Sequence, residues 1–179
     1  RLTMILKKRG LDIEAKATVQ KIEGEPGNMT VTYVDKKGAE HTVTAQGVLA
    51  AAGRKANVDG LFGENFSVEM ERGAIVGDVD GRTSVPHVYV IGDAKAKNIQ
   101  LAHVASAQGE NVVAVITGKK PPLDMSVVPS CVYTTPEIAS VGLTEENAKA
   151  NGIAVKSGKY LTGANGKCLI EGTESGYVK

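Results

Sequence analysis

A short apolar run that ends in Gly-Asp narrows the possible folds of this chain more than any other segment. The run is Val-Tyr-Val-Ile at residues 88–91, and Gly92 and Asp93 follow it directly. A strand that is apolar at every position is expected to be buried on both faces, as in a parallel sheet. Open α/β sheets bind ligands at the carboxyl ends of such strands. Asp93 would therefore offer its carboxylate to hydroxyl groups of a nucleotide or a ribityl chain, and Gly92 would let the backbone come close.

A helix is predicted soon after this run, and it supplies the context that a Gly-Asp dipeptide needs, since the dipeptide alone is usually only a turn. The residues that trace one helix face are Leu101, Val104, Ala105, Gln108, Val112, Val115 and Ile116. Gly118 would end this helix. If the helix begins near Ala102, its unpaired N–H groups and the positive end of its dipole face the same side as Asp93. An electron-rich group, such as the pyrimidine edge of a flavin, would be favoured there.

The first third of the chain is predicted as a short helix followed by an antiparallel meander. Apolar side chains have helical spacing up to Gly10, which would end the helix. Three strand-like segments follow, separated by turn signals: residues 11–19, 29–34 and 41–45. Residues 48–52 are apolar at every position and are predicted as a further strand buried on both faces.

A new unit is predicted to begin near Met125. A strand is expected at residues 131–134, with a turn at Thr135 and Pro136. Thr144 can cap a helix that Gly152 would end. Further strands are expected at residues 155–161 and 168–171.

Composition excludes several classes of function. Lys and Arg total 21 against 20 Asp and Glu, so there is no basic excess for nucleic-acid binding. The longest apolar runs are far shorter than the roughly 20 residues of a membrane span. The two cysteines, Cys131 and Cys168, fit neither a disulfide framework nor a metal site. This usage indicates a reducing cytoplasm. Cys131 is predicted to be a buried strand residue. The start at Arg1, without Met, suggests an internal piece of a longer protein.

Three motifs, in this order, resemble the pyridine-nucleotide disulfide oxidoreductases. They are GRKAN at residues 53–57, TSVPHVYVIGD at residues 83–93 and QLAHVASAQG at residues 100–109. The segment VPSCVYTTPEIASVGLTEENAKANG, residues 128–152, resembles the start of the interface domain in that family. The residues of this segment are most similar to those of the dihydrolipoamide dehydrogenase group, with mercuric reductases next.

The resemblance implies an α/β fold: part of an FAD/NAD(P)-binding Rossmann-like domain with a β-meander, followed by the first part of an α+β dimerisation (interface) domain. Residues 1–52 would be the C-terminal part of the NAD-binding domain. Residues 53–124 would be the second FAD-binding segment, and residues 125–179 the N-terminal part of the interface domain.

The resemblance also implies a set of cofactor-binding residues. Asp93 would hydrogen-bond the flavin ribityl chain, and the backbone around Leu101 and Ala102 would meet the edge of the flavin ring. The candidates are Gly53, Arg54, Gly92, Asp93, Gln100, Leu101, Ala102 and His103. His103 is interpreted as a packing and hydrogen-bonding residue, because catalytic use needs a positioned partner. No catalytic residue and no metal ligand is expected in this chain.

Three features of the family are missing from the sequence: a GxGxxG fingerprint, a Cys-x4-Cys pair, and the C-terminal His-Glu couple that supplies the acid and base. The resemblance implies a homodimeric parent enzyme that uses FAD and NAD. It would oxidise dihydrolipoamide through a redox disulfide and serve the lipoyl domains of 2-oxoacid dehydrogenase complexes. This chain by itself is expected to be inactive. Two alternatives stay open: another disulfide reductase, such as a mercuric reductase-like enzyme, or a non-catalytic folded piece that binds no cofactor firmly.

Overall fold

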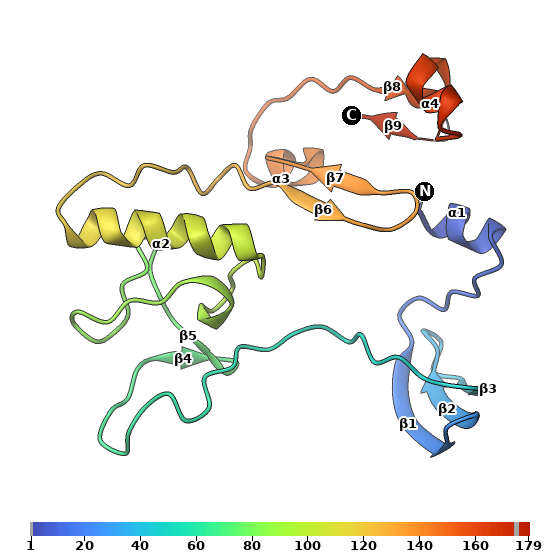
Figure 1. The fold of residues 1–179 in the computed structure, drawn as a ribbon, viewed down its shortest axis with the longest axis horizontal. Coiled ribbons are helices and arrows are strands. Elements are labelled where there is room, and N and C mark those ends of the chain that lie inside the picture. The colour runs from blue at the N-terminus through green and yellow to red at the C-terminus, as the bar shows by residue number, and fades with distance from the viewer. Residues whose placement is uncertain (1, 174–175) are drawn as a thin grey trace. The chain divides into compact units, whose positions relative to one another are not determined.

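The computed structural model describes residues 2–173 and 176–179. The chain forms two compact units that divide between Gly53 and Arg54 (Figure 1). No helix in the described part of the chain is long and apolar enough to cross a membrane.

The N-terminal unit consists of one helix and a three-stranded antiparallel meander. Helix α1 (Leu2–Lys8) ends just before Gly10, as predicted, and Gly10 has a φ of +89°. The strands are β1 (Thr18–Glu25), β2 (Asn28–Val34) and β3 (Glu40–Ala45), in the order β1-β2-β3. The prediction of a meander is confirmed.

The prediction that the first strand starts at residue 11 is wrong, because β1 begins only at Thr18. Thr18 pairs with Val34, which is the last residue of β2. Residues before Thr18 therefore have no strand beside them to complete a ladder, whatever their apolar alternation.

Residues 48–52 are also not a strand, and all five are exposed. Leu49 has 90% of its surface exposed. A strand of a parallel sheet needs a neighbour on at least one side to receive its backbone hydrogen bonds. Among the described residues no segment pairs with residues 48–52.

The C-terminal unit has a small apolar core. Val68, Ile75 and Val90 form its centre. The partly buried side chains packed against them are Val58, Phe62, Val85 and Ala94. Two short strands, β4 (Met70–Glu71) and β5 (Ala74–Ile75), pair beside this core.

The predicted helix is confirmed as α2 (Ala102–Ile116), which buries Val104 and Val112. Residues 88–91, however, do not form the predicted strand. They include a single antiparallel bridge, Arg82 to Tyr89, and Val90 N donates to Gly81 O at 2.8 Å. The partner of this stretch is thus the loop just before it, so Val90 is buried while Ile91 stays 39% exposed. The stretch leads directly into the 3-10 turn η1 (Gly92–Ala94).

The last third holds short elements. Strands β6 (Ser130–Val132) and β7 (Ile138–Ser140) form a hairpin around residues 135 and 136, as the turn signal predicted. Helix α3 (Glu145–Ala150) is capped by Thr144, whose hydroxyl accepts from Asn147 N at 3.1 Å. Cys131 is exposed in this hairpin, so its predicted burial is wrong.

The strands predicted near the C-terminus are only partly present. Of residues 155–161, only β8 (Tyr160–Leu161) is a strand, and it pairs with β9 (Tyr177–Val178). The turn η2 (Thr162–Ala164) leads to α4 (Gly166–Ile170), which contains most of the predicted strand at 168–171. The Asn165 side chain accepts from Cys168 N at 3.1 Å and so caps a helix instead.

Candidate functional site

An open cleft in the C-terminal unit brings together residues from three segments: 54–56, 71–74 and 93–100. The cleft is open to solvent and has a volume of about 280 Å³. Arg54, Asp93 and Gln100, three of the residues predicted to bind a cofactor, lie on its wall.

Asp93 sits in η1 and forms an ion pair across the cleft wall with Arg54. Arg54 Nη2 lies 2.7 Å from Asp93 Oδ2, and the two side chains are 72% and 32% exposed. An exposed pair of this kind stabilises a fold by about 1 kcal/mol at most. Its main effect is therefore to hold a carboxylate and a guanidinium side by side at the cleft, where both can meet a polar ligand.

Gly92 is buried behind Asp93 and needs to be glycine for two reasons. Its φ is +61°, a conformation that L side chains rarely adopt. A Cβ on Gly92 would lie 2.8 Å from Ala105 Cβ on α2. Gly92 thus makes room for the helix against η1, whereas Gly109 on that helix has no such close neighbour. A Cβ on Gly109 would meet only Ile91 Cδ1, at an ordinary 3.6 Å.

The cleft carries an excess of positive charge. Its cationic side chains are Arg54, Lys55, Arg72, Lys95 and Lys97, and its anionic side chains are Glu71 and Asp93. Lys97 Nζ pairs with Glu71 Oε2 at 2.9 Å. A concave surface with this balance attracts anions.

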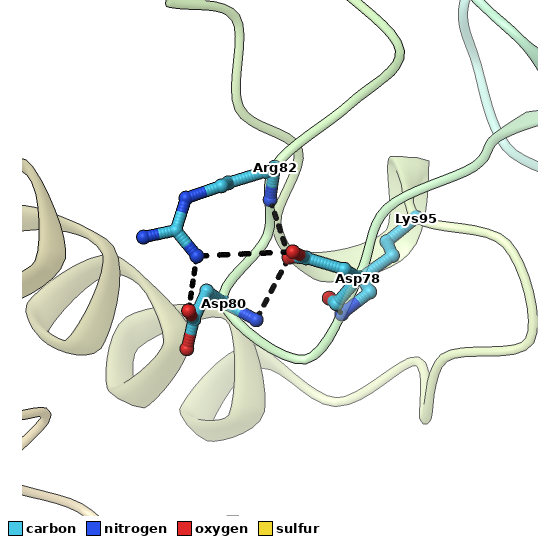
Figure 2. Close-up of polar contacts among 4 residues, drawn as sticks. All are labelled: Asp78, Asp80, Arg82 and Lys95. Carbon is cyan, nitrogen blue, oxygen red and sulfur yellow. Dashed lines mark hydrogen bonds and ion pairs between the residues drawn. The ribbon is translucent and has the colours of Figure 1, made fainter.

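Lys95 also ties the cleft wall to a loop on its other side. Lys95 Nζ donates to Asp78 O at 2.6 Å. In that loop Asp78 Oδ1 accepts from Asp80 N at 2.9 Å and from Arg82 N at 2.8 Å, while the Arg82 guanidinium pairs with Asp80 (Figure 2). Side chains of this loop thus hold its conformation independently of Lys95. The carbonyl oxygen of Asp78 therefore gives Lys95 Nζ a fixed hydrogen-bond acceptor.

The start of α2 lies close to the cleft but does not line it. Gln100 is on the cleft wall, Leu101 is the N-cap without a side-chain cap hydrogen bond, and Ala102 is the first helical residue. His103 Nε2 lies 2.8 Å from Pro129 O. Since a carbonyl oxygen only accepts, His103 Nε2 must carry the proton and donate to Pro129 O. His103 therefore connects α2 with the segment just before β6. Gly53 belongs to the other unit, so it is not placed relative to the cleft.

Sequence reasoning missed two polar residues behind Asp93. Asn98 lines the cleft, and both Asn98 and Gln108 hydrogen-bond Gly92. A signal for Gln108 was present, because it is a polar side chain on the otherwise apolar face of α2. Polar groups on a packed face almost always have a hydrogen-bond partner.

Metal binding has no support in the described residues 2–173 and 176–179. No three His, Cys, Asp or Glu side chains among them are grouped so that they could hold a metal ion.

Two family models match the chain. The model described as pyridine nucleotide-disulphide oxidoreductase matches residues 1–109, and the model of that family's dimerisation domain matches residues 128–179. The predicted fold class, a Rossmann-like part followed by a dimerisation part, is confirmed by these two matches.

Curated relatives match over almost the whole chain. A dihydrolipoyl dehydrogenase of Bacillus subtilis (strain 168) is 42% identical over 182 residues, covering 98% of this chain and 37% of the relative. A dihydrolipoyl dehydrogenase of Rhizobium etli is 38% identical over 176 residues, with 97% and 36% covered. The chain thus spans little more than a third of the length of these relatives.

Solved structures share the fold. LpdA from Mycobacterium tuberculosis superposes with a TM-score of 0.83 at 24% identity, covering 98% of this chain and 38% of that one. The HOCl-induced flavoprotein disulfide reductase RclA from Escherichia coli gives a TM-score of 0.80 at 24% identity, with 98% and 40% covered. At this level of identity the likeness concerns the fold.

Proposed function

Because the chain belongs to the pyridine nucleotide-disulphide oxidoreductase family, we propose that it is the flavin-contacting segment of a dihydrolipoyl dehydrogenase. The observation that carries the proposal is the position of Asp93. Its carboxylate stands on the wall of an open cleft, at the end of an extended stretch and beside Arg54. Relatives at 42% and 38% identity that are named dihydrolipoyl dehydrogenase favour this enzyme over a mercuric reductase-like one.

The residues of the cleft suit FAD by their chemistry. A carboxylate such as Asp93 accepts hydrogen bonds from hydroxyl groups, which a ribityl chain offers in a row. Lysine and arginine side chains on the same wall balance the charge of a diphosphate. The chemistry that FAD supplies when bound is two-electron transfer between a dithiol and a pyridine nucleotide. In this chain Asp93 and Arg54 would hold and orient the cofactor, and Gln100 would add a polar contact.

The division of labour within the parent enzyme is part of the proposal. Residues 1–52 would complete the NAD-binding domain, residues 53–124 would form the second FAD-binding segment, and residues 125–179 would begin the dimer interface. The match of a dimerisation-domain model to residues 128–179 supports a homodimeric parent. The parent would act in the cytoplasm on lipoyl domains of 2-oxoacid dehydrogenase complexes, with NAD as the electron acceptor.

Flavin titration of Asp93 variants tests the proposal. We expect Asp93→Ala to weaken FAD binding about tenfold or more, because a hydrogen bond to a charged group contributes about 1.5–3 kcal/mol and about 1.4 kcal/mol is a factor of ten. Quenching of flavin fluorescence measures the affinity in this chain and in the full-length parent. Asp59→Ala, an exposed carboxylate away from the cleft wall, is the matched control.

Two results would contradict the proposal. One is equal affinity for FAD in wild type, Asp93→Ala and Asp59→Ala. The other is a chain that remains colourless after FAD is added, which would favour a folded piece that binds no cofactor. If the full-length parent reduces another disulfide or mercuric ion and does not oxidise dihydrolipoamide, the proposed substrate is wrong.

A further inference from the structure

We infer that Asn98 and Gln108 form an amide clamp, defined as these two side chains together, which fixes the backbone of Gly92 and thereby positions Asp93 for the flavin. Both are positioning residues, because they act on the ligand through Asp93. The inference rests on the proposed function for its ligand. Its structural part, the fixing of Gly92, stands on hydrogen bonds alone.

The clamp binds both backbone groups of Gly92. Gln108 Oε1 accepts from Gly92 N at 2.8 Å, and Asn98 Nδ2 donates to Gly92 O at 2.8 Å. The two amides also bond each other: Asn98 Nδ2 donates to Gln108 Oε1 at 3.1 Å, and Gln108 Nε2 donates to Asn98 Oδ1 at 2.8 Å. The three residues therefore form a closed ring of hydrogen bonds, and all of them are at least partly buried.

The chemistry of Gly92 dictates which atoms face it. A backbone N–H can only donate, so the Gln108 atom beside it must be oxygen. A backbone carbonyl can only accept, so the Asn98 atom beside it must be nitrogen. Once these two atoms are assigned, the remaining nitrogen of Gln108 meets the remaining oxygen of Asn98, which is again a donor with an acceptor. A carboxylate at position 98 has no donor for Gly92 O, whereas a carboxylate at position 108 still accepts from Gly92 N. Only a side chain without hydrogen-bonding groups removes the bond to Gly92 at both positions.

The clamp connects helix α2 with the cleft wall on which Asp93 lies. Gln108 comes from α2, two turns into the helix, while Asn98 lies on the cleft wall itself. Gly92 lies between them, with its Cα side packed against Ala105. Because Asp93 is the next residue along the chain, a fixed peptide group at Gly92 limits the directions in which the Asp93 carboxylate can point.

Asn111 offers a matched control on the same helix. Asn111 Nδ2 donates to Leu123 O at 2.8 Å and Asn111 Oδ1 accepts from Leu123 N at 3.0 Å. It is thus an asparagine that holds both backbone groups of one residue, as the clamp does, but it is not on the wall that carries Asp93. A loss of stability in general would affect both sites, whereas a loss of positioning would affect only the clamp.

The test uses the variants Asn98→Leu, Gln108→Met and Asn111→Leu in the whole chain, because these side chains are similar in size to the originals and have no hydrogen-bonding amide. We expect amide hydrogen exchange at Gly92 to speed up at least about tenfold in Gln108→Met, because Gly92 N–H then loses its acceptor, and a buried group left unpaired has an effect of that size. In Asn98→Leu, Gly92 O loses a donor and Gln108 loses its bonds to Asn98, so exchange at Gly92 should also speed up. The FAD dissociation constant should rise by a similar factor. In Asn111→Leu the exchange at Leu123 should speed up instead, because Leu123 N loses its acceptor, with FAD affinity within about twofold of wild type.

The outcomes separate the clamp from the proposed function. Unchanged Gly92 exchange in both clamp variants, or equal loss of FAD affinity in all three variants, overturns the inference. If wild type binds no FAD, the proposed function fails, and Gly92 exchange still decides whether the clamp fixes that residue. Should one clamp variant fail to fold by circular dichroism, the other gives the same readouts.

Discussion

Gly92 and Gly109 lie on either side of the contact between η1 and α2, yet the structure uses them differently. Gly92 combines a φ of +61° with a potential Cβ clash of 2.8 Å against Ala105. Gly109 is inside the helix, and a Cβ there would make an ordinary contact of 3.6 Å with the end of the Ile91 side chain. Only the first position therefore requires a glycine.

We predict opposite effects for alanine at the two positions. Gly92→Ala should lower the free energy of unfolding by about 2–4 kcal/mol, from backbone strain together with overpacking. Gly109→Ala should raise the free energy of unfolding by about 0.5–1 kcal/mol, because alanine is the better helix former. Urea denaturation followed by circular dichroism measures both. Equal effects of the same sign would show that Gly92 is not packed against Ala105 as described.

The sequence pointed to residues of the cleft only where the residue type and its immediate neighbours suggest a role. Asp93, which follows an apolar run and a glycine, was predicted to bind a cofactor, and it lies on the cleft wall together with Arg54 and Gln100. Lys55 and Arg72 were missed, because nothing in their local pattern says that segments 54–56 and 71–74 come together. That proximity arises from tertiary packing of residues far apart in the chain.

At the scale of elements, helical periodicity and the Thr144 cap predicted correctly, whereas apolar runs did not predict strands. Helix α2 and the Thr144 cap follow from periodicity and capping within a few residues. Residues 48–52 and 88–91 look like buried strands by composition, but a strand exists only where a neighbour accepts its hydrogen bonds. Sequence within such a segment carries no information about that neighbour, so these two predictions were wrong.

The turn between β2 and β3 is closed by a carboxylate, which makes the meander sensitive to acid. Asp35 Oδ1 accepts from Lys37 N at 2.8 Å and from Ala39 N at 3.0 Å, and Asp35 Oδ2 lies 3.1 Å from His41 Nε2. The pKa of Asp35 is lowered, mainly by the hydrogen bond from the Ala39 backbone, then by His41 and by the Lys37 backbone. A carboxyl whose folded pKa is depressed stabilises the fold above its unfolded pKa and stops doing so as the pH falls through the folded pKa.

We therefore predict that acidification from neutral pH to below the ordinary pKa of aspartate, about 3.9, lowers the protection factors of amides in β2 and β3, that is, their protection relative to an unstructured chain at the same pH. Asp35→Asn keeps an oxygen acceptor for the turn but cannot titrate, so it should remove this dependence on pH. Hydrogen exchange at Thr32 and Thr42, which pair across the two strands, gives the measurement. Asp124→Asn is the control: the pKa of Asp124 is also lowered, by hydrogen bonds from Ser126, but it lies in the other unit. If both variants change the meander alike, the Asp35 turn is not responsible.

For the molecule as a whole, burial is concentrated in one region. The buried apolar residues among those described are Val68, Ile75, Val90, Val104, Val112 and Ala148, all in the C-terminal unit. None of the described residues up to Gly53 is buried. Large apolar side chains stay exposed in the segment that matches the dimerisation-domain model, among them Tyr133, which is 84% exposed. Because this segment also matches a dimerisation-domain model, we expect some of these side chains to contact another chain.

Self-association of the chain should consequently depend on the segment from residue 128 onward. We predict that Tyr133→Asp weakens association about tenfold or more, because an aromatic side chain buried at an interface typically contributes about 2 kcal/mol. Val79→Asp should leave association unchanged: Val79 is 94% exposed but lies outside the matched segment, which makes it a control for the added charge. Sedimentation velocity across a range of concentrations measures the dissociation constant of each variant. An equal loss in both variants would indicate nonspecific apolar clustering, and a wild-type chain that stays monomeric at every concentration would place the dimer contacts outside this segment.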